Sequence, residues 1–219
     1  MTDEIRKFIA EGRSRKATDI HICADTPIMF RIDGKLRRAT QQPLTPEMAR
    51  KLCYALLTDA QIETFERTGD LDLMLAEGEG RHRINIARNN GNVGAVIRLL
   101  PERPWHLDAL KLPETVRELT VCSKGLVLLT GSTGQGKTTT MAAMIDEINR
   151  TQRKHIITIE DPIETVHDNK HSLVRQREVG KDTESFNQGL RAALRQDPDV
   201  IAIGEMRDYE TIRIALTAA

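Results

Sequence analysis

The sequence has few aromatic residues and no excess of charge of either sign. Phe, Trp and Tyr make up 3% of the 219 residues, which leaves few rings on which the bases of a single-stranded nucleic acid could stack. Lys and Arg total 32, as do Asp and Glu, so no overall positive field attracts nucleic acid. The composition therefore predicts a protein that does not bind nucleic acid.

Cysteines and long apolar runs are also scarce. Cys23, Cys53 and Cys122 lie far apart and form no CxxC pair, so they predict neither a zinc site nor a disulfide framework. The longest apolar runs, such as LVLL, are the size of a strand and too short to span a bilayer. The charged segment MTDEIRKFIAEGRSRK lacks the apolar stretch of a signal peptide. These features predict a cytosolic globular protein without direct membrane insertion.

The first hundred residues are typical of an α+β domain. The pattern predicts a helix near residues 3–15, a strand at DIHIC, and a hairpin in MFRIDGKLRR that turns at Asp33 and Gly34. A second helix begins with Thr45 as N-cap and Pro46 at the first helical position. Its apolar stripe is expected to comprise Met48, Leu52, Ala55 and Leu56.

Three more strands are predicted at DLDLMLA, RHRINIA and GAVIRLL. In RHRINIA the alternation puts His82, Ile84 and Ile86 on one face. The opposite face carries Arg81 and Arg83, which need either water or an anionic partner. Three prolines in PERPWHLDALKLP, residues 101–113, then end the strand pattern. We predict a first domain over 1–100, a linker over 101–113 and a second domain over 114–219.

The second domain follows an α/β plan with a mainly parallel sheet. GLVLLT, residues 125–130, is predicted as a central strand because it is apolar and flanked by glycines. It leads directly into GSTGQGKT, which matches the phosphate-loop pattern GxxxxGK[ST], and then into a helical segment. A strand, a glycine loop and a helix in this order are the context that separates a phosphate loop from a chance glycine-rich turn.

The chemistry of phosphate binding explains the spacing within this loop. Gly131, Gly134 and Gly136 allow the backbone to curl so that its N–H groups point at phosphate oxygens. Lys137 is expected to reach the β- and γ-phosphates, and the Thr138 hydroxyl to ligate Mg²⁺. The sequence contains no guanine-reading motif Asn/Thr-Lys-x-Asp, which favours ATP over GTP.

Two further apolar strands are predicted to end in carboxylates. HIITIEDP ends in Glu160 and Asp161, with Glu164 close behind, and DVIAIGE ends in Glu205. Ligands of open α/β sheets bind beyond the carboxyl ends of the strands, so these groups are expected beside the phosphate loop. Glu205 is the candidate for orienting the attacking water. The alternative is that the carboxylates only cap loops.

Three segments resemble a known family. GSTGQGKTTT, ITIEDPIETVH and LRAALRQDPDVIAIGEMRDYETIRIALTAA are similar to the Walker A, Asp box and Walker B segments of type II/IV secretion-superfamily ATPases. Within that superfamily the sequence looks most like the type IV pilus retraction (twitching motility) ATPases. KATDIHICADTPIMFRIDGKLRR and LVRQREVGKDTESF share this similarity, and the chain lacks the CxxC…CxxC insertion of many assembly and secretion motors.

The resemblance implies a PAS-like α+β N-terminal domain followed by a RecA-like P-loop NTPase core. It also implies a homo-hexameric ring that works in the cytoplasm, at the inner face of the cell membrane, against a pilus inner-membrane platform protein. The implied cofactors are ATP and Mg²⁺, and the implied activity is ATP hydrolysis that drives pilus disassembly.

Site residues follow from the same resemblance by matching motifs. The catalytic group comprises Glu205 with the Asp box residues Glu160, Asp161 and Glu164. Thr138 and Glu205 are the expected metal-binding residues. The nucleotide-binding residues are Gly131, Ser132, Thr133, Gly134, Gln135, Gly136, Lys137, Thr138 and Thr139, with Arg83 and Arg98 reaching the nucleotide from the first domain.

The family pattern continues beyond ALTAA with a His box and a helical C-terminal domain, so we expect this chain to be truncated at its C-terminus. Hydrolysis by the chain alone depends on whether those parts are needed. One alternative is a nucleotide-binding subunit, or an accessory paralogue of the pilus or type II secretion machinery, without turnover of its own. Another is a P-loop kinase, although no dedicated acceptor site is visible.

Overall fold

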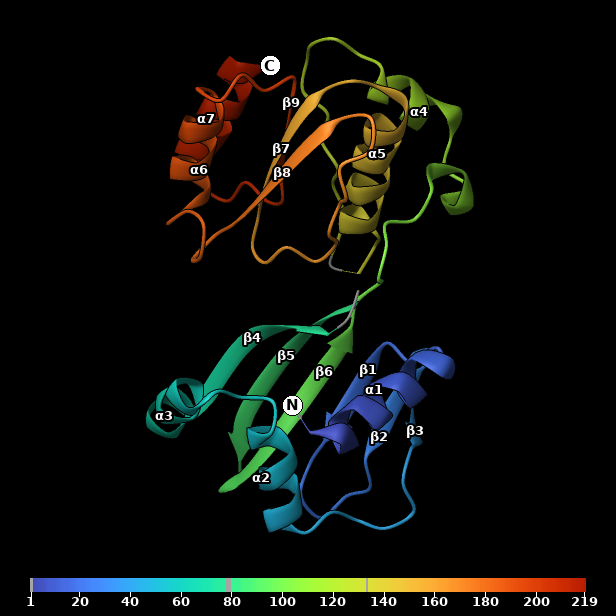
Figure 1. Cartoon of the computed structure of the whole chain (residues 1–219), viewed down its shortest axis with the longest axis vertical. Helices are drawn as coiled ribbons and strands as arrows, with labels where there is room; N and C mark the ends of the chain where they lie inside the picture. The colour runs from blue at the N-terminus through green and yellow to red at the C-terminus, as the bar shows by residue number, and fades with distance from the viewer. Residues whose placement is uncertain (1, 78–79, 133) are drawn as a thin grey trace. The chain divides into compact units, whose positions relative to one another are not determined.

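The chain folds into two compact units, Met1–Glu102 and Arg103–Ala219. The structure is a computed structural model that describes residues 2–77, 80–132 and 134–219 (Figure 1). One unit is built on an antiparallel sheet and the other on a parallel sheet. The α/β fold class predicted from the sequence is therefore confirmed at this level.

The first unit contains a six-stranded sheet in the order β3-β2-β1-β6-β5-β4, in which every neighbouring pair is antiparallel. The strands are β1 Asp19–Ile22, β2 Met29–Ile32, β3 Lys35–Arg38, β4 Asp70–Glu77, β5 Gly80–Asn89 and β6 Asn92–Leu99. The helices are α1 Asp3–Ser14, α2 Pro46–Tyr54 and α3 Asp59–Thr68. All six predicted strands, counting the two of the hairpin, and both predicted helices are present, and α3 is additional.

Local sequence signals shape this unit as expected. Asp33 and Gly34 take positive φ angles of 50° and 74°, as the tight turn between β2 and β3 requires. The Thr45 side chain accepts a hydrogen bond from the Met48 amide at 3.3 Å and caps α2. The predicted stripe of α2 is wrong at Met48, which is 48% exposed because it lies in the first turn, while Leu52 is buried in the core.

The core of the first unit is almost purely apolar. Its fully buried side chains include Phe30, Phe65 and a set of isoleucines contributed by α1 and by β1, β5 and β6. In β5 the predicted alternation is confirmed, since Ile84 and Ile86 are buried and Arg83 is exposed. One continuous apolar core therefore lies between the helices and one face of the sheet.

The second unit contains a three-stranded parallel sheet in the order β8-β7-β9. The strands are β7 His155–Glu160, β8 Leu173–Glu178 and β9 Val200–Ile203. The helices are the short 3-10 helix η1 Leu107–Leu110, α4 Glu114–Thr120, α5 Lys137–Thr151, α6 Phe186–Ala193 and α7 Tyr209–Ala218.

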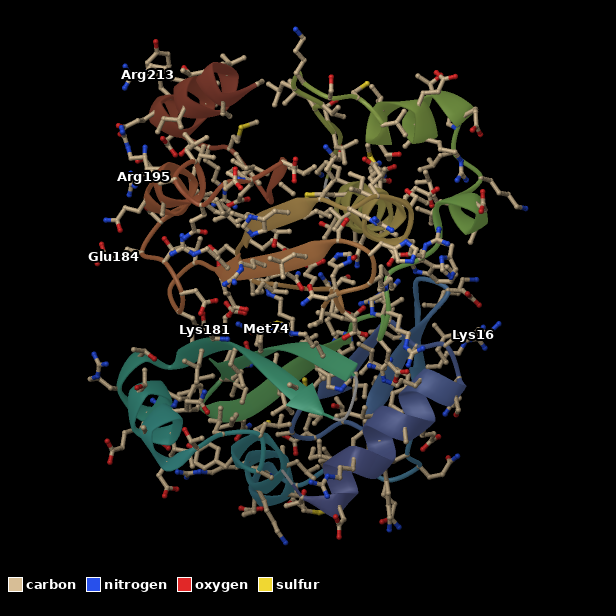
Figure 2. The ribbon with its side chains drawn as sticks, turned by 45° about the horizontal axis from the view of Figure 1, so that its top comes forward. Lys16, Met74, Lys181, Glu184, Arg195 and Arg213 are labelled. Carbon is tan, nitrogen blue, oxygen red and sulfur yellow. The ribbon has the colours of Figure 1, made fainter. Side chains whose placement is uncertain are left out.

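Helices cover both faces of the parallel sheet (Figure 1). On one face, Ile156 of β7 and Val174 of β8 pack against Ile145 and Ile148 of α5. On the other face, apolar side chains of β7, α6 and α7 form a second cluster: Ile157, Ile159, Leu190, Ala193, Ile214 and Ala215. Charged side chains such as Arg213 of α7 point away from the layers (Figure 2). The second unit is therefore a three-layer α/β structure.

The prediction of a central strand at residues 125–130 is wrong. This segment has no strand conformation, and within the described part of the chain no strand pairs with it. Leu128 is 58% exposed, and the three residues around it are 38–41% exposed. An apolar run becomes a buried strand only when its backbone groups form hydrogen bonds with neighbouring strands. Among the described residues, the one backbone hydrogen bond of segment 125–130 runs from the Gly125 amide to the Ala219 carbonyl, which belongs to no strand.

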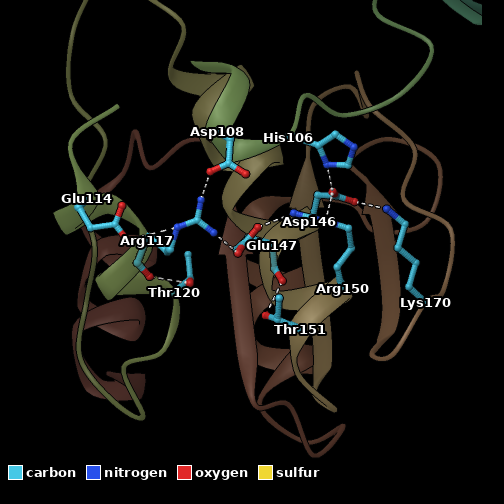
Figure 3. A network of polar contacts seen from close by, with 10 residues as sticks. All are labelled: His106, Asp108, Glu114, Arg117, Thr120, Asp146, Glu147, Arg150, Thr151 and Lys170. Carbon is cyan, nitrogen blue, oxygen red and sulfur yellow. Dashed lines mark hydrogen bonds and ion pairs between the residues drawn. The ribbon is translucent and has the colours of Figure 1, made fainter. Parts of the chain in front are cut away.

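A charged network fixes the linker and the Asp box loop to α5 (Figure 3). Asp146, near the middle of α5, is 1% exposed and sits among three cationic or ionisable groups. His106 of the linker approaches it at 3.6 Å, Arg150 donates to it at 3.1 Å, and Lys170 forms an ion pair with it. One buried carboxylate thereby connects three separate segments of the second unit.

The neighbouring carboxylate, Glu147, extends this network to α4. Arg117 of α4 and Arg150 each donate to Glu147 at 2.5 Å. Arg117 also forms an ion pair with Asp108 of η1 (Figure 3). Ionic contacts therefore attach residues 106–108 and α4 to α5.

Candidate nucleotide-binding site

The glycine loop has the backbone conformation for which its glycines were expected. Gly131, Gly134 and Gly136 have φ angles of 148°, 80° and 83°, in the region that side chains disfavour. Gly136 is the N-cap residue of α5. Thr133, also expected in the site, lies outside the described residues. The loop therefore ends in the free N–H groups of a 15-residue helix, where anions bind favourably.

Lys137, the first residue of α5, folds back over the loop. Its Nζ donates to the carbonyl oxygens of Gly131 at 2.7 Å and of Ser132 at 2.8 Å. The ammonium group is thus held at the mouth of the loop, where a phosphate oxygen could accept its protons. The remaining predicted loop residues are accessible: Gln135 and Thr138 are exposed, and Thr139 is half-buried.

Chain topology brings the loop and the predicted carboxylates to the same end of the second unit. Helix α5 ends at Thr151 and β7 begins at His155, so the helix runs back along the sheet antiparallel to the strand. A 15-residue helix is about 22 Å long and a six-residue strand about 20 Å. The start of α5, where Lys137 lies, therefore coincides with the carboxyl end of β7, where Glu160 lies.

Strand alternation also determines which face Glu160 occupies. Ile156 points at α5, so Thr158 and Glu160 lie on the same face as that residue. Glu160 is 6% exposed. Its Oε1 accepts hydrogen bonds from Thr158 Oγ1 at 2.6 Å and from Gln176 Nε2 at 3.1 Å. The first Asp box carboxylate is therefore buried and hydrogen-bonded on the α5 side of the sheet.

The other two Asp box carboxylates are in a different environment. Asp161 is exposed and Glu164 half-buried. Neither makes a hydrogen bond or ion pair with another residue that the structure describes. They follow Glu160 on the loop 161–172 and remain available to a ligand at the carboxyl end of the sheet.

Glu205 follows β9 at the same end. The Gly204 amide donates to the Ile159 carbonyl at 2.8 Å, which sets residues 204 and 205 beside the end of β7. The Glu205 carboxylate is about one-third exposed and pairs with Arg207 at 2.9 Å. The structure thus brings Glu160, Asp161 and Glu205 together by strand pairing.

Arg83 and Arg98 lie in the first unit, directly opposite each other on β5 and β6. Like charges in that arrangement destabilise a sheet. Asp19 offsets part of the repulsion, since it accepts from Arg98 at 3.0 Å, and Asp72 lies 3.9 Å from Arg83. Both guanidinium groups are about half exposed and keep further donors for an anion.

Three contributors to the site carry no recognisable motif. Thr158 and Gln176 hold Glu160, and Arg207 holds Glu205. The alternation of Thr158 with Glu160 is visible in the sequence, but the approach of Gln176 requires the pairing of β7 with β8. These contacts became apparent only from the fold.

The residues present suit a magnesium ion that arrives with a nucleotide. Within the described ranges no three His, Cys, Asp or Glu side chains are arranged to hold a metal by themselves. Mg²⁺ is usually bound by one or two protein oxygens together with substrate phosphates and water. The exposed Thr138 hydroxyl and the carboxylates near β7 and β9 satisfy that requirement.

A glycine loop opening a helix, with carboxylates at the adjacent strand ends, defines a P-loop nucleotide-binding protein of the α/β class. Comparison with known proteins agrees. The sequence profile of the type II/IV secretion system protein family matches residues 1–219. The chain therefore belongs to this family.

Individual relatives show which branch is most similar. The type IV pilus retraction ATPase PilT of Pseudomonas aeruginosa is 44% identical over 217 residues, which cover 99% of this chain and 63% of PilT. A twitching motility protein of Neisseria gonorrhoeae is 42% identical over 192 residues, 87% of this chain and 51% of that protein. The chain thus spans between half and two thirds of the length of these relatives.

A solved structure shares the fold. The crystal structure of the pilus retraction motor PilT with bound ADP superposes with a TM-score of 0.90 at 48% identity, over 98% of this chain and 63% of that one. Among the helices of the described residues, none is long and apolar enough to cross a membrane.

Proposed function

We propose that this chain is the nucleotide-binding part of an ATPase that powers type IV pilus retraction. One observation carries the proposal: the glycine loop and the carboxylates of the Asp box and Glu205 share one end of the parallel sheet. The similarity to PilT, a pilus retraction motor, supports the same conclusion and supplies the biological role.

The chain's own groups suit an in-line attack of water on the γ-phosphate. The loop amides and the N-terminus of α5 bind the phosphates, and Lys137 neutralises the charge that develops on them. Glu205 orients the attacking water, with Asp161 and Glu164 close to the same strand end. Mg²⁺, held by Thr138 and through Glu205, would neutralise the phosphate oxygens further.

The remaining features of the proposal come from the family. They are a PAS-like first domain and a RecA-like second domain, joined by a linker, within a homo-hexameric ring. Arg83 and Arg98 would reach the nucleotide from the first domain; an arginine finger of this kind contributes about 10³- to 10⁵-fold in rate in GTPases. The ring would lie in the cytoplasm at the inner face of the membrane, bound to the platform protein of the pilus.

Phosphate release by the whole protein that contains these residues tests the proposal. We expect Mg²⁺-dependent release, a fall of about 100-fold or more in Glu205→Gln with ATP binding retained, and loss of binding in Lys137→Ala. Glu184→Gln, the same change at an exposed glutamate outside the predicted site, is the control and should leave phosphate release unchanged.

Two results would contradict the proposal. Full phosphate release in Glu205→Gln alongside loss of release in Lys137→Ala would assign the chemistry to another residue. Tight ATP binding without release by the wild-type protein would instead identify the nucleotide-binding subunit or accessory paralogue without turnover.

A further inference from the structure

We infer that Gln176 is a positioning residue of the Asp box: its amide fixes Glu160 and the first half of the loop 161–172. These contacts keep Asp161 and Glu164 out of the layer between the sheet and α5, at the carboxyl end of β7. The structural role of Gln176 follows from its observed contacts. Its effect on turnover also rests on the proposed function.

Gln176 lies in the middle of β8, directly beside Thr158 of β7. Alternation along β8 puts it on the same face as Val174, which packs against α5, so Thr158, Glu160 and Gln176 share that face. Its amide is therefore directed into the layer between the sheet and α5, where the Asp box loop also passes.

All the polar atoms of the Gln176 side chain are used there. Nε2 donates to Glu160 Oε1 at 3.1 Å and to the Thr165 carbonyl at 2.8 Å. Oε1 accepts from the His167 amide at 2.8 Å. One side chain therefore joins the first Asp box carboxylate to two backbone groups five and seven residues further along.

The donors around Glu160 give it a different role from its neighbours. The hydrogen bonds from Thr158 and Gln176 converge on a single oxygen of a carboxylate that is 6% exposed. A carboxylate held in this way has a fixed position, because displacing it would break both hydrogen bonds in a buried environment. Glu160 is thus suited to anchor the strand end, while the accessible Asp161 and Glu164 are suited to meet the ligand.

The second half of the same loop is fixed separately, by Asn149 of α5. Its Nδ2 donates to the Asp168 carbonyl at 2.7 Å, and its Oδ1 accepts from the Lys170 amide at 3.1 Å. Two amide side chains therefore hold the loop: half-buried Gln176 from the sheet and buried Asn149 from the helix that begins at Lys137. The Ile163 amide donates separately to Glu178 Oε2 at 3.2 Å, so loss of Gln176 is expected to release the stretch 164–167, which carries Glu164.

Gln176→Met tests this inference in the whole protein, because methionine has a similar size and can form none of the three hydrogen bonds. A misplacement of about 1 Å in a catalytic group lowers turnover by about 100-fold, so we expect kcat to fall at least 10-fold. The dissociation constant for ATP should stay within about twofold, since the glycine loop is untouched. Gln188→Met, on the exposed face of α6, is the matched control and should leave kcat unchanged.

Gln176→Glu separates the donor role of the amide from its acceptor role. Glutamate retains an oxygen for the His167 amide but cannot donate to Glu160 or to the Thr165 carbonyl. We expect kcat as low as in Gln176→Met, and a Tm no higher than in that variant, because the new carboxylate would lie against the Glu160 carboxylate. Wild-type kcat in Gln176→Glu or in Gln176→Met would overturn the inference.

Amide hydrogen exchange gives a test that does not depend on turnover. In Gln176→Met, the His167 amide should exchange at least 10-fold faster than in the wild type, because it loses its acceptor. The Lys170 amide should change little, because Asn149 still accepts from it. Unchanged exchange at His167 would overturn the inference. If the wild type releases no phosphate, the proposed function fails, and this measurement still decides the structural role of Gln176.

Discussion

The two units of this chain bury different kinds of side chain. The first unit has one large core, in which isoleucines and Phe65 fill the space between the helices and the antiparallel sheet. The second unit has two smaller apolar clusters, one on each face of its sheet, and most of the buried polar residues described in the chain. Most buried polar groups in proteins are hydrogen-bonded, and a hydrogen-bonded buried group has a closely specified position.

This difference follows the chemistry of each unit. In the second unit most of the buried polar residues lie in the C-terminal half of α5, along β7 and in the Asp box loop, and Glu160 among them lies at the end of the sheet where the phosphate site is proposed. In the first unit the functional candidates Arg83 and Arg98 are on the exposed face of the sheet, so the core is free to be apolar. The same comparison predicts different responses to mutation.

The largest effect is expected from Phe65→Ala in the first unit. Phe65 is fully buried, stacks edge-on against Tyr54 at 6.1 Å, and lies under the guanidinium of Arg88 at 5.4 Å. Truncating a buried phenylalanine costs about 3–5 kcal/mol of unfolding free energy. Circular dichroism during urea unfolding should show an early transition of the first unit.

Trp105 provides a separate probe, because it is the single tryptophan and belongs to the second unit. Its fluorescence transition should keep its midpoint in Phe65→Ala. Leu36→Ala, at a residue that is 49% exposed, is the control and should change stability by less than about 0.5 kcal/mol. An equal shift of both probes in Phe65→Ala would show that the two cores do not act separately.

A smaller effect is expected from Asp146→Ala in the second unit. Removing one partner of a buried ion pair lowers the free energy of unfolding by about 3–5 kcal/mol. Arg150 and Lys170 are about one-third exposed and can be hydrated when Asp146 is lost, so we expect a smaller loss of about 2–3 kcal/mol. Trp105 fluorescence should report this loss, and the control Asp108→Ala, at a 77% exposed partner of Arg117, should have almost no effect. A loss in Asp108→Ala as large as in Asp146→Ala would contradict the role of burial.

The smallest of the three effects is pH-dependent and arises in both units. Burial lowers the pKa of His82 in the first unit and of His167 in the second to about 4. The unfolded histidines bind protons below about pH 6.5, whereas the folded ones stay neutral until about pH 4, so stability falls as the pH decreases between these values. At pH 5 each histidine should lower the free energy of unfolding by up to about 2 kcal/mol relative to neutral pH.

His82→Gln and His167→Gln test this pH dependence separately. Each should flatten the decline between pH 7.5 and 5 in its own unit, as measured by circular dichroism for the first and by Trp105 fluorescence for the second. An unchanged slope in both variants would assign the decline to other groups.

The features predictable from sequence are those set by local chemistry. The Asp33-Gly34 turn, the Thr45 cap and the alternation in β5 each depend on a few adjacent residues, and each is present. Helix α3 was missed although its signals are local: Thr58 and Gln61 form a capping box, and Gly69 ends the helix with a φ of 78°. A search for paired start and stop signals would have found it.

Features that depend on distant pairing were not predictable. The apolar run 125–130 has the composition of a buried strand, but a strand forms only with a partner, and sequence alone does not reveal the partner. The same limit applies to the site. The glycine loop and the strand-end carboxylates follow from motifs, whereas the approach of Gln176 to Glu160 depends on the register of β7 and β8.

Equilibrium binding of ATP with Mg²⁺ to residues 1–219 and to the Lys137→Ala variant, by isothermal titration calorimetry, tests the central claim most directly. We predict one nucleotide per chain for the wild type and at least 100-fold weaker binding for the variant, since Lys137 and the loop amides hold the phosphates. No binding to the wild type, or equal binding to both, would contradict a nucleotide site at the start of α5.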